Sequence, residues 1–356
     1  MQESYPVIAK VPTHIFTWGK WIEESLGDQK EIVLCITGNP GLPGFYTQFL
    51  STVYECLNKE LPVWVIGQAG HDEADDSPYK KPVPPLQGNE NMYNLQGQLQ
   101  HKIEFIRKYV PEDVKIHLIG HSIGAYMALE LLKIPDISDR VQHCYFLFPT
   151  LERMAGSKNG FIATRLVNPV WFALRWFYRM FALLPLFVRT WIIYLYYLVD
   201  GIPKYYLGTG LKYMNPDVID KIWFLAMDEM KKVNELDVET LAKNKQRIKL
   251  YYGTVDGWVP VKYYHELKQR IPDIEAELCT RKYEHAFVLR SAAQMGYSVE
   301  QVSAFIQLAV SVRNEKLCRG TQKIGNHLLK IRSSQLTVVG EGFNVSSLWT
   351  NYVNIV

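Results

Sequence analysis

The strongest chemical signal in the chain is a serine between two glycines, in the run Gly120-His121-Ser122-Ile123-Gly124. An apolar segment over 114–119 precedes it and predicts a strand, while good helix formers follow over 125–133. A strand, a GxSxG turn and a helix form the context in which a bend presents a serine oxygen as a nucleophile. A plain glycine-rich turn is the alternative. The sequence predicts a nucleophile elbow with Ser122 at its tip.

A serine hydroxyl attacks poorly until an imidazole accepts its proton, and a carboxylate must fix the tautomer of that imidazole. In chains with such an elbow, the acid and the base follow the serine along the sequence, first Asp or Glu and then His. Asp256 follows a strand predicted over 248–252, and His285 follows another predicted over 274–279. Alone, Asp256 could be a turn residue, and His285 a loop or core histidine. Their order and positions together predict a triad with Ser122.

Attack on an ester carbonyl creates an oxyanion, which needs two preorganised hydrogen-bond donors. One expected donor is the backbone N–H of Ile123, the residue after the nucleophile. The other should come from the loop Gly38-Asn39-Pro40-Gly41, which follows a strand predicted over 31–37. Because proline has no N–H, we expect Asn39 to donate; a simple turn is the alternative. His71, after the next strand, is a candidate for the mouth of the site.

The elements that must position these side chains alternate along the chain. Short apolar runs and amphipathic stretches alternate over 31–149 and again after residue 247, which is typical of a parallel sheet covered by helices. Strands are expected at 31–37, 61–67, 114–119, 141–148, 248–252 and 274–279, and helices at 45–57, 92–110 and 261–270. We predict one α/β domain over 1–318, a mostly parallel sheet with helices on both faces and an inserted, hydrophobic helical cap over 150–245. Residues 319–356 are expected to form a poorly ordered tail.

Length and composition exclude several classes of protein. The 356 residues are 48% hydrophobic and 21% charged, the balance of a globular protein. A net charge of +3, spread evenly, gives no reason to expect nucleic acid as a partner. The five cysteines show no CxxC spacing, and the predicted chemistry needs neither a metal nor a cofactor. Since the N-terminus lacks the pattern of a secretory signal, we expect the catalytic part to face the reducing cytosol.

Residues 170–199 are unusually apolar: 25 of the 30 are apolar and 11 are aromatic, and the segment contains no acid. Pro185 divides it into halves of about 15 residues, and a helix of that length spans about 22 Å, less than the roughly 30 Å hydrocarbon layer. We therefore predict a Pro-kinked hairpin that enters one leaflet, with arginines snorkelling at the interface. A buried cap core and a full membrane span are the alternatives. The expected anchors are Trp171, Trp176, Phe181, Pro185 and Trp191.

Several segments together resemble the lipid-droplet-associated hydrolase family of the α/β-hydrolase fold. They are 37–41 (TGNPG), 120–126 (GHSIGAY), 146–154 (FLFPTLERM) with Asn159-Gly160, 251–256 (YYGTVD) and 285–287 (HAF). The likeness covers about residues 30–312, and the family's nucleophile, acid and base fall on Ser122, Asp256 and His285.

This resemblance implies a serine esterase of neutral lipids, sterol esters first, with a role in cholesterol and triglyceride homeostasis. The implied partners are the lipid droplet monolayer and the endoplasmic reticulum membrane. The sequence does not identify a protein partner. Two other classes stay open. An acyltransferase or thioesterase would use the same triad on another acceptor or substrate, and a droplet-bound adaptor would keep the fold with little catalysis.

Overall fold

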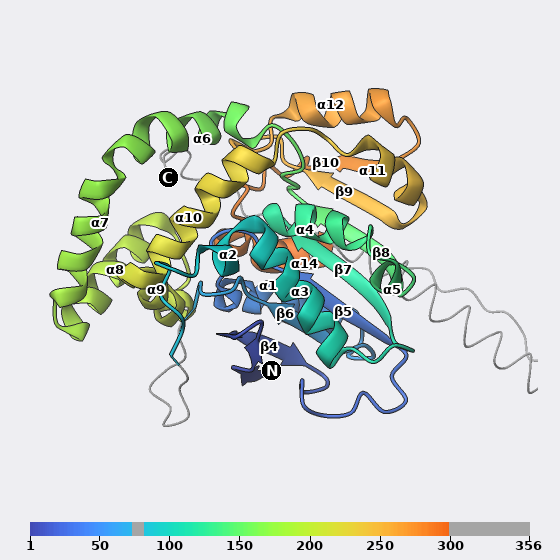
Figure 1. The fold of residues 1–356 in the computed structure, drawn as a ribbon, viewed down its shortest axis with the longest axis horizontal. Coiled ribbons are helices and arrows are strands. Elements are labelled where there is room, and N and C mark those ends of the chain that lie inside the picture. The colour runs from blue at the N-terminus through green and yellow to red at the C-terminus, as the bar shows by residue number, and fades with distance from the viewer. Residues whose placement is uncertain (73–81, 299–356) are drawn as a thin grey trace, which may run out of the picture. The chain divides into compact units, whose positions relative to one another are not determined.

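A sheet of eight strands runs through the centre of the fold, in the order β1-β4-β6-β5-β7-β8-β9-β10 (Figure 1). The computed structural model describes residues 1–72 and 82–298. The strands are β1 (Gln2–Ser4), β4 (Ile15–Trp18), β5 (Glu31–Ile36), β6 (Val63–Ile66), β7 (Lys115–His121), β8 (Val141–Leu147), β9 (Ile248–Tyr252) and β10 (Glu275–Leu278). All neighbours from β6 to β10 are parallel, whereas β1 and β4 are antiparallel at one edge. The predicted mostly parallel sheet is confirmed.

All six predicted strands are present, and β9 has the predicted bounds. Four strands were not predicted: β1, β4 and the two of a small hairpin, β2 (Val7–Ile8) and β3 (Val11–Pro12). All four residues of β4 are buried, so no apolar–polar alternation marks it. The predicted tail at 319–356, and the end of the predicted domain at 318, lie outside the described residues.

Helices cover both faces of the sheet. α3 (Leu95–Tyr109) and α4 (Ile123–Leu131) lie in front of it in Figure 1, while α1 (Thr47–Cys56) and α14 (Ala292–Ser298) pack on each other behind it. The side chain of Asn94 caps α3 by accepting a hydrogen bond from the backbone N–H of Gly97 at 2.8 Å. Among the described residues, the other helices outside the insertion are η1 (Pro43–Tyr46), α2 (Glu90–Tyr93), α5 (Pro135–Ser138), α12 (Val261–Arg270) and α13 (Phe287–Arg290).

Between β8 and β9 the chain forms helices and loops only. The elements are η2 (Met154–Gly156), α6 (Lys158–Phe161), the π-helical η3 (Ile162–Val167), α7 (Asn168–Leu183), α8 (Leu186–Asp200), η4 (Lys204–Tyr206), α9 (Leu207–Tyr213), α10 (Pro216–Lys232), α11 (Val238–Asn244) and η5 (Lys245–Arg247). In Figure 1 the helices α6 to α10 stand together on one side of the sheet, with α7 at the rim. Pro185 separates α7 from α8, as expected for two short arms.

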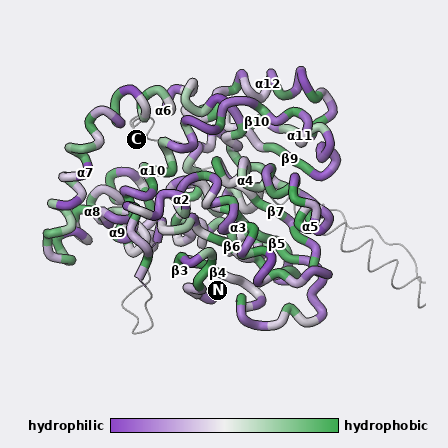
Figure 2. The backbone as a smooth tube through the Cα atoms, in the orientation of Figure 1, coloured by the Kyte–Doolittle hydropathy of each residue, from purple (hydrophilic) through white to green (hydrophobic). Residues whose placement is uncertain are grey.

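Most large apolar side chains of α7 and α8 are exposed, which contradicts the alternative of a buried cap core. Figure 2 shows apolar stretches both in the central strands and in these two helices at the rim. The exposed residues, called here the apolar face, are Val170, Phe172, Trp176, Phe177, Met180, Leu183, Leu186, Phe187, Trp191, Ile192, Leu195, Tyr196, Leu198 and Val199. In the part of the chain that the structure describes, no helix has both the length and the hydropathy needed to cross a bilayer.

The inner side of the two helices packs on the rest of the protein. Phe181 is only 6% exposed, so its predicted contact with lipid is wrong. Trp171 is half-buried and stacks on Trp223 of α10, with ring centroids 4.4 Å apart. Arg175 points to α10 as well, where its Nε donates to Asp220 at 2.8 Å. This arginine therefore does not snorkel; it attaches α7 to α10.

Candidate active site

The elbow has the geometry that its glycines require. Ser122 lies between β7 and α4 with φ 54° and ψ −122°, a positive φ that a residue with a side chain rarely adopts. A Cβ on Gly120 would lie 2.6 Å from Cα of Ala125, and one on Gly124 would lie 2.3 Å from the carbonyl oxygen of Ile36. No side chain fits at either position, so the two glycines allow the tight bend that turns the serine out of the strand.

The three predicted triad side chains lie within hydrogen-bond distance of one another. The Nε2 atom of His285 is 2.9 Å from Oγ of Ser122, and its Nδ1 is 2.7 Å from Oδ2 of Asp256. A carboxylate only accepts, so Nδ1 carries the proton and Nε2 is left to accept the serine proton. The other Asp256 oxygen accepts from the backbone N–H groups of Trp258 and Val259, at 2.7 and 3.0 Å. These bonds fix the carboxylate in a fully buried position.

The predicted oxyanion loop lies directly beside the nucleophile. A Cβ on Gly38 would stand 3.1 Å from Cβ of Ser122, and Ile123 begins the helix that follows the serine. Polar groups hold both ends of the loop: Gly38 N–H donates to the Tyr46 hydroxyl at 2.8 Å, and Gly41 N–H donates to Nδ1 of His71 at 3.2 Å. His71 is fully buried, so it supports the loop and does not line the mouth of the site.

The histidine of the elbow links the oxyanion loop to the base. A carbonyl oxygen only accepts, so Nε2 of His121 carries the ring proton and donates it to the carbonyl oxygen of His285 at 2.9 Å. Nδ1 of the neutral ring is then an acceptor, and the Tyr46 hydroxyl, 2.6 Å away, donates to it while it accepts from Gly38 N–H. Burial lowers the pKa of His121 to about 3, which keeps the ring neutral as this chain of bonds requires. His121 therefore positions two loops.

Aromatic rings form the walls around the base. The rings of Phe148 and Trp258 lie 6.0 and 6.4 Å from the ring of His285, between centroids. Phe287 stacks on Phe148 at 5.5 Å, and both phenylalanines are buried. This apolar wall suits an apolar substrate.

The inserted helices contact the segments on either side of the site. Arg290, on the short helix after His285, donates to the carbonyl oxygen of Asp200 at 2.7 Å and forms ion pairs with the side chains of Asp200 and Glu284. Asp200 ends α8, and Glu284 precedes the base. On the acid side, Asn159 N–H donates to the carbonyl oxygen of Gly257 at 2.9 Å. The loops that carry the acid and the base are thus both tied to the insertion.

Sequence reasoning missed Tyr46, Arg290 and the acid Glu229 of α10, whose Oε1 accepts from Nδ2 of Asn39 at 3.1 Å. No local pattern marks the first two, because Tyr46 meets His121 and Arg290 meets Asp200 across 75 and 90 residues. Glu229 did carry a signal: with Val218, Ile222 and Leu225 it falls at i, i+4, i+7 and i+11, on the apolar side of its helix. An acid at such a position must be neutralised or paired.

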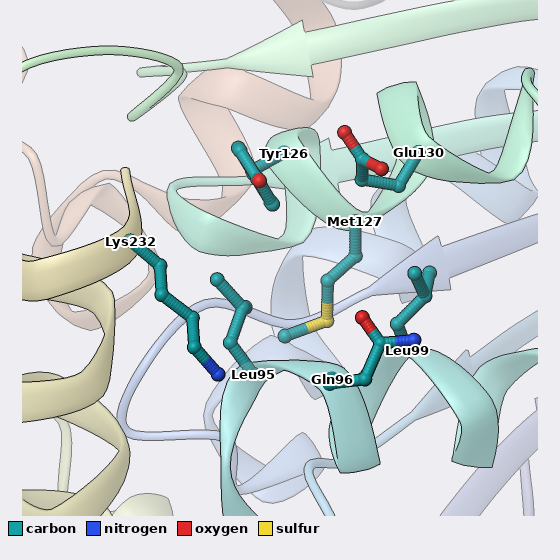
Figure 3. A pocket seen from close by; sticks show the side chains of 7 residues that line it. All are labelled: Leu95, Gln96, Leu99, Tyr126, Met127, Glu130 and Lys232. Carbon is teal, nitrogen blue, oxygen red and sulfur yellow. The ribbon is translucent and has the colours of Figure 1, made fainter. Parts of the chain in front are cut away.

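A separate shallow pocket lies between α3, α4 and α10 (Figure 3). Its lining residues are Leu95, Gln96, Leu99, Tyr126, Met127, Glu130 and Lys232. It contains none of the triad residues, so we assign it no part in the chemistry.

Comparison with known proteins gives a consistent match. A family model described as lipid-droplet associated hydrolase matches residues 29–288. A Drosophila melanogaster protein named lipid droplet-associated hydrolase is 52% identical over 303 residues, covering 85% of this chain and 98% of that protein. The Homo sapiens protein of that name is 32% identical, with coverages of 83% and 92%. A solved meta-cleavage product hydrolase superposes with a TM-score of 0.54 at 14% identity, over 84% and 96% of the chains. The predicted α/β-hydrolase fold is thereby confirmed.

Proposed function

The chain belongs to the lipid-droplet associated hydrolase family, and we propose that it cleaves carboxylic esters of neutral lipids at the surface of lipid droplets, with sterol esters as the leading candidate substrate. The observation that carries this proposal is the pair of hydrogen bonds that joins Ser122, His285 and Asp256 at 2.9 and 2.7 Å. The names of the relatives supply the droplet and the hydrolase class. The apolar walls around His285 support an apolar acyl group.

The proposed reaction has two halves. In the first, Oγ of Ser122 bonds to the ester carbonyl carbon while its proton moves to Nε2 of His285; the intermediate then expels the alcohol, which takes that proton, and leaves an acyl-serine. In the second, a water molecule gives its proton to Nε2 and attacks the acyl-serine, and the returned proton restores the serine as the fatty acid leaves. The backbone N–H groups of Ile123 and Asn39 stabilise the oxyanion in both halves. Asp256 holds the imidazole in the required tautomer.

We assign the droplet contact to the apolar face of α7 and α8. A droplet has a phospholipid monolayer over oil, and helices of 16 and 15 residues can lie in such a monolayer without spanning it. Trp176, Pro185 and Trp191 are exposed on these helices and remain anchors in the proposal, with Trp171 at the edge. The same surface suits the cytosolic leaflet of the endoplasmic reticulum. Docking there would bring the active site beside lipid esters dissolved in the oil. By cleaving these esters, the protein would act on cholesterol and triglyceride stores.

The test is fatty-acid release from droplets that contain cholesteryl oleate or trioleoylglycerol, with Ser122→Ala as the control. We expect release by the wild type and none above background by the variant, with the sterol ester turned over faster. Addition of a long-chain alcohol separates hydrolysis from acyl transfer, because a transferase would form a new ester in place of free acid. Equal release by wild type and Ser122→Ala would refute the proposed function, and so would no release at all, as expected of an adaptor.

A further inference from the structure

A buried acid on α10 holds the oxyanion loop from outside the site. Glu229 is 2% exposed, and its Oε1 accepts from Nδ2 of Asn39 at 3.1 Å. The second proton of the same amide goes to the backbone carbonyl oxygen of Ile222 at 3.2 Å. Since α10 accepts both amide protons, the side chain of Asn39 is fixed to that helix.

We propose that Glu229 is a positioning residue that must be uncharged to hold the Asn39 turn of the oxyanion loop beside Ser122. This inference rests on the proposed function and adds to it a proton-dependent element. Tyr46 fixes the loop at Gly38 and His71 fixes it at Gly41, whereas Glu229 acts between them, on the residue whose N–H is the proposed second donor. Loss of this middle contact would displace that donor while the ends of the loop stay in place.

The surroundings of Glu229 favour the neutral acid. Burial raises its pKa to about 8; the hydrogen bond from Asn39 opposes this rise, and the charge of Asp228 adds to it. Within the described part of the chain, no ion pair includes Glu229, and the nearby charges have other partners. Each charged group in the following list lies on α10 or close to it and is given with the partner that it contacts: Arg175 and Arg179 with Asp220, Lys102 with Gln68 and His101, Lys212 with Asp72, Arg153 with Glu152 and Glu266, Glu90 with Gly88, Lys221 over the Tyr93 ring, and Lys232 with Asp228.

Ionisation of Glu229 would place an unpaired charge in a buried position. A buried carboxylate without a cation is unfavourable, so it draws in water or moves toward solvent. Either change breaks the contact with Asn39 and loosens the oxyanion loop. A glutamine at this position keeps a neutral oxygen acceptor of the same shape and does not ionise. Activity should therefore decline at alkaline pH in the wild type and not in Glu229→Gln.

The experiment measures hydrolysis of p-nitrophenyl butyrate by the purified full-length protein between about pH 6 and about pH 10. This ester is soluble in water, so the readout does not depend on droplet binding. In the wild type, kcat should fall with a midpoint near pH 8, and Glu229→Gln should keep its neutral-pH kcat up to the highest pH tested. Glu229→Ala should lose about 10- to 100-fold in kcat at neutral pH, with KM changed much less. Glu235→Gln is the matched control, an exposed acid just beyond α10, and should keep the wild-type profile.

Two results would overturn this role while the wild type is active: the same alkaline decline in Glu229→Gln as in the wild type, or a wild-type kcat in Glu229→Ala. If Glu229→Ala does not fold, as judged by circular dichroism, the comparison of the wild type with Glu229→Gln decides alone. No turnover by the wild type above the Ser122→Ala background at any pH would refute the proposed function, and this role with it.

Discussion

Removing three aromatic side chains from the apolar face should release the protein from lipid. Trp176, Phe187 and Trp191 are 51%, 68% and 60% exposed, and we consider the triple replacement of these residues by serine. A large aromatic side chain has roughly 200 Å² of surface, so each exposes about 100 to 140 Å². At about 25 cal/mol per Å², full insertion would contribute about 3 kcal/mol for each side chain.

Insertion to half that extent would contribute about 4.5 kcal/mol for the three residues together, so their loss should lower the partition coefficient onto lipid by about 10³-fold. The assay is flotation of the purified protein with artificial droplets, phospholipid over triolein, at increasing lipid concentration. Tyr297→Ser is the matched control, because Tyr297 is 59% exposed but lies on α14, and it should float like the wild type. If the triple variant floats as well as the wild type, the apolar face is not the anchor.

Point replacements are a sharper test than deletion of residues 171–197. That deletion would also remove Phe181, Ile193 and Tyr197, which are buried. It would further cut the ion pair between Arg175 and Asp220. A protein that lost droplet binding after such a deletion could simply be misfolded, whereas the three serine replacements lie on the outer surface.

Three further predictions concern the site. Asp256→Asn should lower kcat about 10⁴-fold with little change in KM, measured with p-nitrophenyl butyrate; a loss below tenfold would contradict the triad. Gly38→Ala should cost about 10² to 10³ in kcat, because its Cβ would stand 3.1 Å from Cβ of Ser122, whereas Gly208→Ala has open space and should be neutral. Between pH 4.5 and about 8, Glu229 carries a proton in the folded chain but not in the unfolded chain, so the free energy of unfolding falls as the pH rises. When this free energy is measured by urea unfolding, it should fall more in the wild type than in Glu229→Gln between about pH 5 and about pH 8, by up to about 4 kcal/mol. Equal losses would show that the carboxyl is not protonated when folded.

Local sequence patterns were sufficient to predict the elements that carry the triad. The elbow around Ser122 follows from a short motif in its strand-turn-helix context, and the loops of Asp256 and His285 follow from strand ends. These features are set by neighbouring residues, so they can be recognised without knowledge of tertiary contacts.

Tertiary contacts decided what the sequence did not reveal. Residues 170–199 are apolar along most of their length, so hydropathy alone could not distinguish the exposed Trp176 from the buried Phe181. Likewise, Tyr46 meets His121 across 75 residues, and Glu229 meets Asn39 across 190. The first pair depends on how η1 packs beside the end of β7, and the second on how α10 of the insertion packs beside the oxyanion loop. No local pattern specifies either contact.

The central claim is that His285 and Asp256 make the Ser122 oxygen reactive. The most direct measurement is covalent labelling of the purified protein by a fluorophosphonate, with the modified residue mapped by mass spectrometry. We expect a single phosphonylated residue, Ser122, with no labelling of Ser122→Ala and labelling of His285→Ala slowed by at least about 10³-fold. Unlabelled wild-type protein, or a His285→Ala variant that reacts as fast as the wild type, would contradict it.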